Sequence, residues 1–321
     1  MNEKNDLPLT ITVPAENRTT LTVLVKSAAG LSNTEARRLI ESGSVLLGTE
    51  PCLDPVARPR AQIITIAADP KRTLRSPSKR KVPTLNGPGF DTIYLDESII
   101  VVNKQSGYLT IPTSSDDTER ASGEVSLVAG VAEALRQSGR KAKQLFVVHR
   151  IDRETSGLVC FARQERAYEI LREHFRHRRP TREYLAWTMA VPAEATGRLH
   201  HYLREDPKTH RVEAVGEDLA GEDSTAKEAI LDYRIEVARP HGARLRIALV
   251  TGRRNQIRAQ LAAAGWPIRA DRWYGEVVAN PGRTALHAHR LAFDHPIRDR
   301  RITCEAPLPE DLRRMDARLF G

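Results

Sequence analysis

The chain has 321 residues, of which 40% are hydrophobic and 28% charged, a composition typical of globular proteins and unlike that of disordered chains. The 50 basic residues exceed the 41 acidic ones, so the net charge of +9 favours a polyanionic partner, above all nucleic acid. No apolar run is long enough for a membrane span, and we expect no signal peptide. Three isolated cysteines argue against a disulfide scaffold or a cysteine zinc site, so we expect a cytoplasmic protein.

A small unit of two helices followed by two short strands is predicted near the N-terminus. Apolar residues in 21–28 have helical spacing, and Gly30 can end that helix. Ser32 and Glu35 have the spacing of a capping box, which predicts the start of a second helix. The two strands are expected at Val45–Leu47 and Ile63–Ile66.

This order of elements, with the segment GLSNTEARRLIESGSV, resembles the S-four-like RNA-binding domain, named after a ribosomal protein. A plain helix-turn-helix is the alternative interpretation. Leu47-Gly48-Thr49 departs from the asparagine-glycine turn that is common in that family. In either case Arg37 and Arg38 are the exposed cations expected to bind RNA, and we set this domain at residues 18–70.

Residues 71–88 are predicted to be a linker rich in proline and serine. Between Lys71 and Lys81 the chain has six basic residues and no acidic one. Such a segment is either a solvated linker or a flexible arm that contacts phosphates. A second domain is expected over residues 89–321.

The second domain mixes strands and helices without a strict βαβ order. Strands are expected at Ile99–Val102, Leu145–Val148, Leu158–Ala162, Tyr184–Val191 and Ile247–Val250, helices at 126–138, 165–176 and around 257–264, and a loop at Thr113–Glu124. This pattern predicts an α+β fold with a mainly antiparallel sheet.

A dense group of polar residues, HRIDRETSGL (149–158), lies between two of these strands. Within it Asp152 follows a strand end, where a carboxylate can be partly desolvated and held rigidly, as a nucleophile or general base requires. Such a charge needs a cation, and Arg150, Arg153 and Arg258 are candidates. The alternative is that Asp152 is a turn residue or part of a structural ion pair.

HRIDRETSGL resembles the catalytic loop of the RluA-family pseudouridine synthases, which usually show His-Arg-Leu-Asp, two residues and then Thr-Ser-Gly. Four further segments resemble that family's motifs in the same order, namely VVNKQSGYLTIP, EYLAWT, TGRRNQIRAQLAAAGWPIRADRWYG and ALHAHRLAFDHP. The resemblance covers about residues 91–310. It implies a pseudouridine synthase catalytic domain that isomerises uridine in RNA with neither a cofactor nor a metal.

The resemblance also implies a role for individual residues. Asp152 is the implied catalytic carboxylate, Tyr184 the active-site tyrosine, and Arg258 the cation that keeps Asp152 ionised. The residues expected to bind RNA in this domain are Arg150, Arg153 and Arg253, and a side chain at the position of Arg153 is expected to fill the space left by a flipped base.

By analogy, ribosomal RNA is the favoured partner, tRNA is possible, and a monomer is expected. The contrasting hypothesis is a non-catalytic RNA-binding or ribosome-assembly factor that keeps the fold. The sequence departs from the family at Gln105 (usually Pro), Asn255 (usually His) and Ala270 (usually Gly), and Thr181–Glu183 lacks a lysine that is common there. Gln105 is expected to loosen a turn and Asn255 to act on a helix start. None of the four is expected to touch Asp152, Tyr184 or Arg258.

Other side chains are expected to be structural. His287 and His289 lack the partners of a metal site, Cys160 reads as a core thiol, and Ser156 lacks the motif of a serine hydrolase. The three tryptophans, Trp187, Trp266 and Trp273, are expected to pack in the core, although each ring is able to stack on a base.

Overall fold

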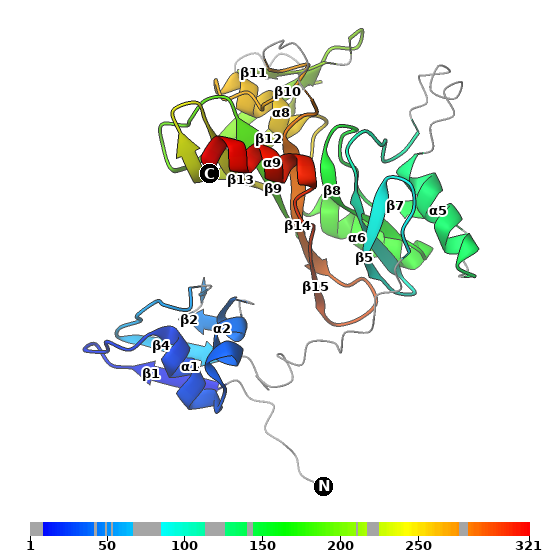
Figure 1. The fold of residues 1–321 in the computed structure, drawn as a ribbon. Coiled ribbons are helices and arrows are strands. Elements are labelled where there is room, and N and C mark those ends of the chain that lie inside the picture. The colour runs from blue at the N-terminus through cyan, green and yellow to red at the C-terminus, as the bar shows by residue number, and fades with distance from the viewer. Residues whose placement is uncertain are drawn as a thin grey trace. The chain divides into compact units, whose positions relative to one another are not determined.

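The structure, a computed structural model, describes most of the chain (Figure 1). The described residues are 9–41, 44–48, 50–52, 54–66, 85–112, 126–139, 144–209, 211–216, 225–275 and 282–321. The chain divides into two compact units, Met1–Lys81 and Val82–Gly321, each with its own core. The basic segment Lys71–Lys81, the predicted loop Thr113–Glu124 and Thr49 lie outside the described residues.

The N-terminal unit combines two helices with a four-stranded antiparallel sheet of order β1-β4-β2-β3. Its elements are β1 (Leu9–Val13), α1 (Leu21–Ala29), α2 (Asn33–Glu41), β2 (Val45–Leu47), β3 (Glu50–Pro51) and β4 (Gln62–Ile66). Leu21, Leu39 and Ile64 are fully buried in one core that joins both helices to the sheet. Strand β1 is not among the predicted elements. Its sequence, LTITV, is too short to indicate a strand by itself, and the strand is stabilised by its pairing with β4.

The predicted capping box at the start of α2 is confirmed. The Ser32 backbone N–H donates to Glu35 Oε2 over 2.8 Å, and the Glu35 N–H donates to Ser32 Oγ over 3.3 Å. Ala36 faces the core, so Arg37 and Arg38 are left exposed to solvent. The start of this helix is therefore fixed by local sequence. The exposure of its two arginines results from the burial of its opposite, apolar face.

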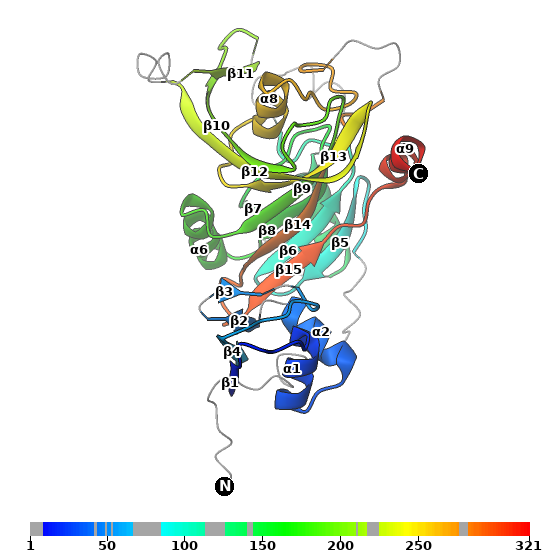
Figure 2. The same ribbon diagram turned by 90° about the vertical axis from the view of Figure 1, so that its left-hand side faces the viewer.

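The C-terminal unit is built on one long sheet of order β11-β10-β12-β13-β9-β14-β8-β6-β5, with β15 on β14 and β7 on β8 (Figure 2). Its strands are β5 (Phe90–Leu95), β6 (Ile99–Lys104), β7 (Phe146–Val147), β8 (Ser156–Ala162), β9 (Thr181–Thr188), β10 (Thr196–Glu205), β11 (Val212–Val215), β12 (Lys227–Arg239), β13 (Gly242–Leu249), β14 (Leu286–Asp294) and β15 (Arg301–Glu305). Every pairing is antiparallel except that of β14 with β8. The predicted α+β fold with a mainly antiparallel sheet is confirmed.

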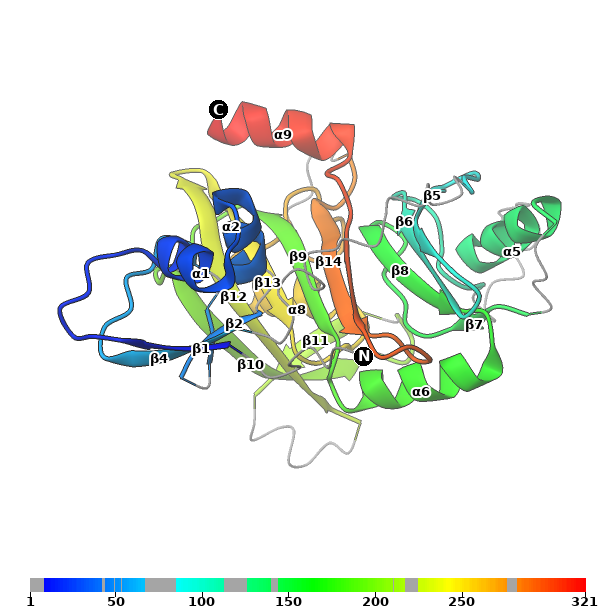
Figure 3. The same cartoon turned by 90° about the horizontal axis from the view of Figure 1, so that it is seen from below.

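Within the described residues of this unit, four helices pack on the sheet (Figure 3). They are α5 (Leu127–Gln137), α6 (Glu165–Arg176), α8 (Gln256–Ala263) and α9 (Glu310–Phe320). Ile100 and Val102 of β6 share a core with α5, whereas Ile99 and Val101 share another with α6. Both faces of β6 are therefore covered, which explains its continuous apolar run. In the described part of the chain, no helix is long and apolar enough to cross a membrane.

The parallel contact between β8 and β14 brings two backbones unusually close. A Cβ atom at Gly157 would lie 2.2 Å from the carbonyl oxygen of Ala288, and Gly157 has φ +115°. Only glycine fits this position without strain. Gly157 therefore sets where the loop that precedes β8 leaves the sheet, and this loop contains Asp152.

Candidate active site

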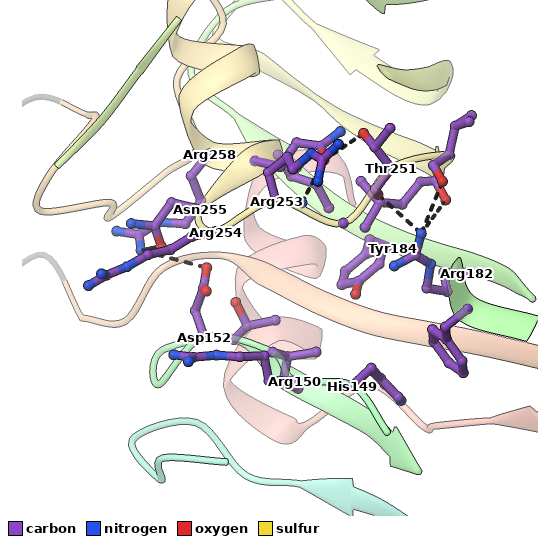
Figure 4. A pocket seen from close by; sticks show the side chains of 18 of the residues that line it. His149, Arg150, Asp152, Arg182, Tyr184, Thr251, Arg253, Arg254, Asn255 and Arg258 are labelled. Carbon is purple, nitrogen blue, oxygen red and sulfur yellow. Dashed lines mark hydrogen bonds and ion pairs between the residues drawn. The ribbon is translucent and has the colours of Figure 1, made fainter. Parts of the chain in front are cut away.

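A cavity of about 600 Å³ opens on the sheet of the C-terminal unit (Figure 4). Among the segments that line it are the loop that precedes β8, strand β9, and the stretch from the end of β13 into the first turn of α8. They contribute Asp152, Tyr184 and Arg258 respectively. The structure thus brings together the three residues predicted to perform the chemistry, although up to 106 positions separate them in the sequence.

The loop that contains Asp152 is held by its own turn and by a neighbouring segment. The Thr155 N–H donates to the Asp152 carbonyl over 3.1 Å, and Thr110 Oγ1 donates to the Ile151 carbonyl over 2.9 Å. Ile151 is buried, so its side chain anchors the loop while the Asp152 side chain stays 25% exposed. The carboxylate consequently meets the cavity in a fixed position.

Arg258 faces Asp152 and is itself fixed from behind. Its Nη1 lies 3.8 Å from Asp152 Oδ2, while its Nε and Nη2 each donate to the Asp271 carboxylate over 2.7 Å. Asp271 is fully buried, and its bidentate pair with Arg258 leaves the guanidinium no freedom to turn. The sequence alone does not single out Asp271, because its pairing with Arg258 forms only when the chain folds.

Burial and charge set the protonation of Asp152 and Tyr184 in the cavity. Burial raises the pKa of the Asp152 carboxyl, and the charges of Arg258, Arg150 and Lys104 oppose that rise without cancelling it. Burial also raises the pKa of the Tyr184 phenol, with Arg182 opposing and Asp152 adding to the rise. The Tyr184 hydroxyl therefore keeps its proton at neutral pH beside an acid held in the same cavity.

Lys104 is a buried contact of this loop that sequence analysis missed. Its Nζ is within hydrogen-bonding distance of three carbonyl oxygens, those of Gln105 (2.9 Å), Tyr108 (2.7 Å) and Arg153 (2.9 Å). Three acceptors match the three N–H bonds of an ammonium group, although burial lowers the pKa of Lys104 to about 7. Lys104 thereby ties the turn after β6 to the loop that contains Asp152.

Arg182 performs the same task for the segment before α8. Its Nη2 donates to the carbonyls of Leu249, Val250 and Thr251 over 3.1 to 3.3 Å. A Cβ atom at Gly252 would lie 2.6 Å from Arg182 Nη1, so the glycine allows this close approach. The departure noted at Thr181–Glu183 thus still provides a long cation, which supports the backbone that leads to Arg258.

The other departures from the family have local explanations, and two expectations are wrong. Asn255 does touch Arg258: its Oδ1 accepts from Arg258 Nη1 over 3.1 Å, and it makes no side-chain cap of α8. Gln105 does not loosen its turn, since its N–H donates to the Gly89 carbonyl over 2.8 Å, a bond that proline lacks. Ala270 has φ +58°, the backbone region in which glycine is unstrained.

The cavity is strongly basic. Seven arginines line it, and Asp152 is the single carboxylate among the described residues that do so. The arginines are Arg150, Arg176, Arg178, Arg182, Arg253, Arg254 and Arg258. Of the cations predicted to bind RNA, Arg150 and Arg253 lie here, whereas Arg153 does not line the cavity. A phosphate backbone at its entrance would therefore meet an excess of positive charge.

The side chains expected to be structural have partners in the structure. Ser156 Oγ lies 2.7 Å from His287 Nδ1, and His287 Nε2 lies 3.3 Å from the Ala306 carbonyl oxygen. Cys160 and Trp187 are fully buried. Within the described ranges, no group of three or more His, Cys, Asp or Glu side chains is arranged to hold a metal ion.

Comparison with known proteins agrees with this architecture. Residues 98–263 match the family model for RNA pseudouridylate synthases. Ribosomal large subunit pseudouridine synthase C of Haemophilus ducreyi is 30% identical over 234 residues, which cover 71% of this chain and 68% of the relative. The dual-specificity RNA pseudouridine synthase RluA of Escherichia coli K12 is 30% identical over 223 residues, which cover 68% of this chain and 94% of the relative.

Among solved structures, human RNA Pseudouridylate Synthase Domain Containing 4 superposes with a TM-score of 0.58 at 19% identity, covering 71% of this chain and 92% of that chain. The sheet is therefore that of the pseudouridine synthase fold. The chain belongs to the RluA family of RNA pseudouridine synthases, which are RNA isomerases. The family predicted from the HRIDRETSGL segment is confirmed.

We expect Lys104→Met to lower the free energy of unfolding by about 1–3 kcal/mol, because it removes the buried donor shared by three carbonyls. The Arg153 carbonyl still accepts from the Gly107 N–H, so the loss falls mainly on the carbonyls of Gln105 and Tyr108. Urea unfolding of the whole chain measures this change. The matched control is Lys208→Met at an exposed lysine of the same unit, with an expected change within about 0.5 kcal/mol. Equal losses in the two variants would contradict the role given to Lys104.

We expect Arg258→Gln to raise the pKa of Asp152 further. The change removes the nearest cation and leaves the charge of Asp271 uncompensated, and both effects favour the protonated acid. Carbon-13 NMR titration of labelled aspartate carboxyls measures the shift, with Asp152→Asn to assign the signal. Arg246→Gln, at an arginine paired with Glu183 and Glu236, is the control that should leave this titration unchanged.

Proposed function

We propose that Asp152 is the catalytic carboxylate with which this enzyme isomerises uridine to pseudouridine. Its position as the single carboxylate among the described lining residues, facing Arg258, supports this role most directly. In the reaction the bond between uracil N1 and the sugar C1′ breaks, the base turns, and a bond from C5 to C1′ forms. The proton on C5 is lost and N1 gains one, so nothing is added overall.

Asp152 acts on the sugar in this proposal, as a nucleophile or as a base for a sugar proton, and both roles need the ionised form. Arg258 supplies the charge that favours ionisation against the effect of burial. Tyr184 places an aromatic ring and a protonated hydroxyl in the same cavity, where the ring can stack on uracil while the base turns.

The substrate we propose is a structured RNA, with ribosomal RNA favoured and tRNA possible. One relative is named for the large ribosomal subunit and another for dual specificity, and each is 30% identical to this chain. A uridine in a duplex must leave the stack to reach the cavity. Exposed Arg150 is the loop cation best placed to occupy the vacated space, because it lines the cavity and Arg153 does not.

We further propose that the N-terminal unit is an S-four-like RNA-binding domain over residues 18–70, followed by a linker (71–88) and the catalytic domain (89–321). The support is the order of α1, α2 and short strands, together with two adjacent exposed arginines on α2. Arg37 and Arg38 would contact phosphates, which adds affinity without selecting a base.

We expect Asp152→Asn to abolish pseudouridine formation at the target, with a rate loss of at least about 100-fold. Carbodiimide-based mapping of pseudouridine across total RNA would compare cells that lack the protein with cells given the wild type or the variant. Asp232→Asn is the control, because this carboxylate pairs with Arg198 outside the cavity. A site restored by Asp152→Asn would remove Asp152 from the mechanism. If no site depends on the wild type, the assembly-factor hypothesis takes its place.

We expect the double change Arg37→Ala with Arg38→Ala to weaken RNA binding and to reduce the salt dependence of log K by about two units of slope. A stem-loop RNA of mixed sequence, titrated at several salt concentrations, measures both effects. Arg58→Ala with Arg60→Ala removes the same charge from another exposed site of this unit. An equal loss in the two double variants would indicate net charge alone and no contact by α2.

A further inference from the structure

Trp273 is exposed where the other tryptophans are not. Trp187 is fully buried and Trp266 packs edge-on against Tyr233, whereas Trp273 is 47% exposed. The expectation that all three pack in the core is therefore wrong for Trp273. A solvent-facing indole leaves a large apolar surface in water, so its position relative to the active site matters.

The Trp273 ring lies beside the active-site arginine. The Cζ of Arg258 is 5.8 Å from the centroid of the Trp273 ring and 5.1 Å from that of Tyr274. Because Arg258 also lies 3.8 Å from the Asp152 carboxylate, one guanidinium contacts both the catalytic acid and the exposed indole. The indole does not itself line the cavity, but it lies beside Arg258, which does.

The backbone under this ring is fixed by the carboxylate that holds Arg258. Asp271 Oδ1 accepts from the N–H of Trp273 over 3.0 Å and from the N–H of Tyr274 over 3.2 Å. The Tyr274 hydroxyl accepts from the Val212 N–H over 3.1 Å, which ties the segment to β11. A rigid, preorganised aromatic surface loses little conformational entropy when a flat ligand binds to it.

The surroundings of Trp273 are cationic. Arg272 and Arg211 are both exposed, and within the described ranges neither has a carboxylate partner. The guanidinium of Arg211 lies 5.6 Å from the centroid of the Tyr274 ring, so cations and aromatic rings alternate along this surface. Alternating cations and aromatic rings are typical of surfaces that bind unpaired nucleotides.

We propose that Trp273 stacks on a base of the substrate RNA next to the uridine in the cavity. This inference rests on the proposed function and names a binding residue for it. When a uridine turns out of a stack, its neighbours lose a stacking partner. An indole beside the cavity restores one such contact, while Arg272 and Arg211 face the adjoining phosphates.

The test compares Trp273→Phe with Trp273→Leu, because both remain apolar but only phenylalanine has a π-face. The probes are a 12-nucleotide oligouridine and an abasic chain with the same number of phosphates.

We expect Trp273→Leu to bind the oligouridine roughly 5- to 150-fold more weakly than Trp273→Phe, the range for loss of one base–aromatic stack. The two variants should bind the abasic chain equally. Ile297→Ala, which truncates another exposed apolar side chain, should bind both probes like the wild type.

Tryptophan fluorescence gives a second readout. Oligouridine should quench the wild-type emission, and most of that quenching should disappear in Trp273→Phe, since Trp187 is buried and Trp266 is packed. Equal affinities of the phenylalanine and leucine variants for oligouridine, or unchanged quenching without Trp273, would overturn the proposal. Failure of the catalytic proposal would instead appear as activity in Asp152→Asn, with the Trp273 binding difference intact.

Discussion

The bidentate pair between Arg258 and Asp271 is the interaction on which the site depends. It uses two of the three guanidinium nitrogens, Nε and Nη2, and directs the third, Nη1, toward Asp152 and Asn255. The same Asp271 carboxylate holds the backbone of Trp273 and Tyr274. One buried ion pair therefore sets the position of the cation beside Asp152 and of the aromatic surface next to that cation. Breaking a pair of this kind leaves a buried charge without compensation, which is strongly unfavourable.

Two further cations, Lys104 and Arg182, each bind several backbone carbonyls, which sets them apart from the exposed cations proposed to bind RNA. Lys104 binds three carbonyls and holds the loop that contains Asp152, while Arg182 binds three carbonyls before α8. Arg150 and Arg253, by contrast, are exposed at the cavity. The basic composition of the chain thus serves two purposes. Some cations replace water around irregular backbone, and others create the positive potential that attracts a polyanion.

Much of the fold could be predicted where the signal is local. The capping box of α2, the left-handed Gly30 after α1, the apolar run of β6 and the amphipathic α6 all appear where the sequence indicates. Strand β9 begins at Thr181, three residues before the predicted start, and β10 and β12 were not predicted at all. Strand β10 lies next to the edge strand β11 and contains many polar side chains. It lacks the apolar pattern that would predict a strand, and it is a strand because it pairs with β11 and β12.

The sequence by itself determined the family, through five ordered motifs, and it singled out Asp152, Tyr184 and Arg258 as residues of one site. The tertiary structure alone decided which groups support them. Asp271 meets Arg258 across 13 positions of the sequence. Lys104 meets the Arg153 carbonyl across 49 positions, and Arg182 meets the Thr251 carbonyl across 69. It also decided that Arg150 lines the cavity where Arg153 does not, and that Trp273 faces solvent. The physical reason is that a motif specifies residue types in order, whereas contact, burial and charge pairing exist only after the sheet brings distant segments together.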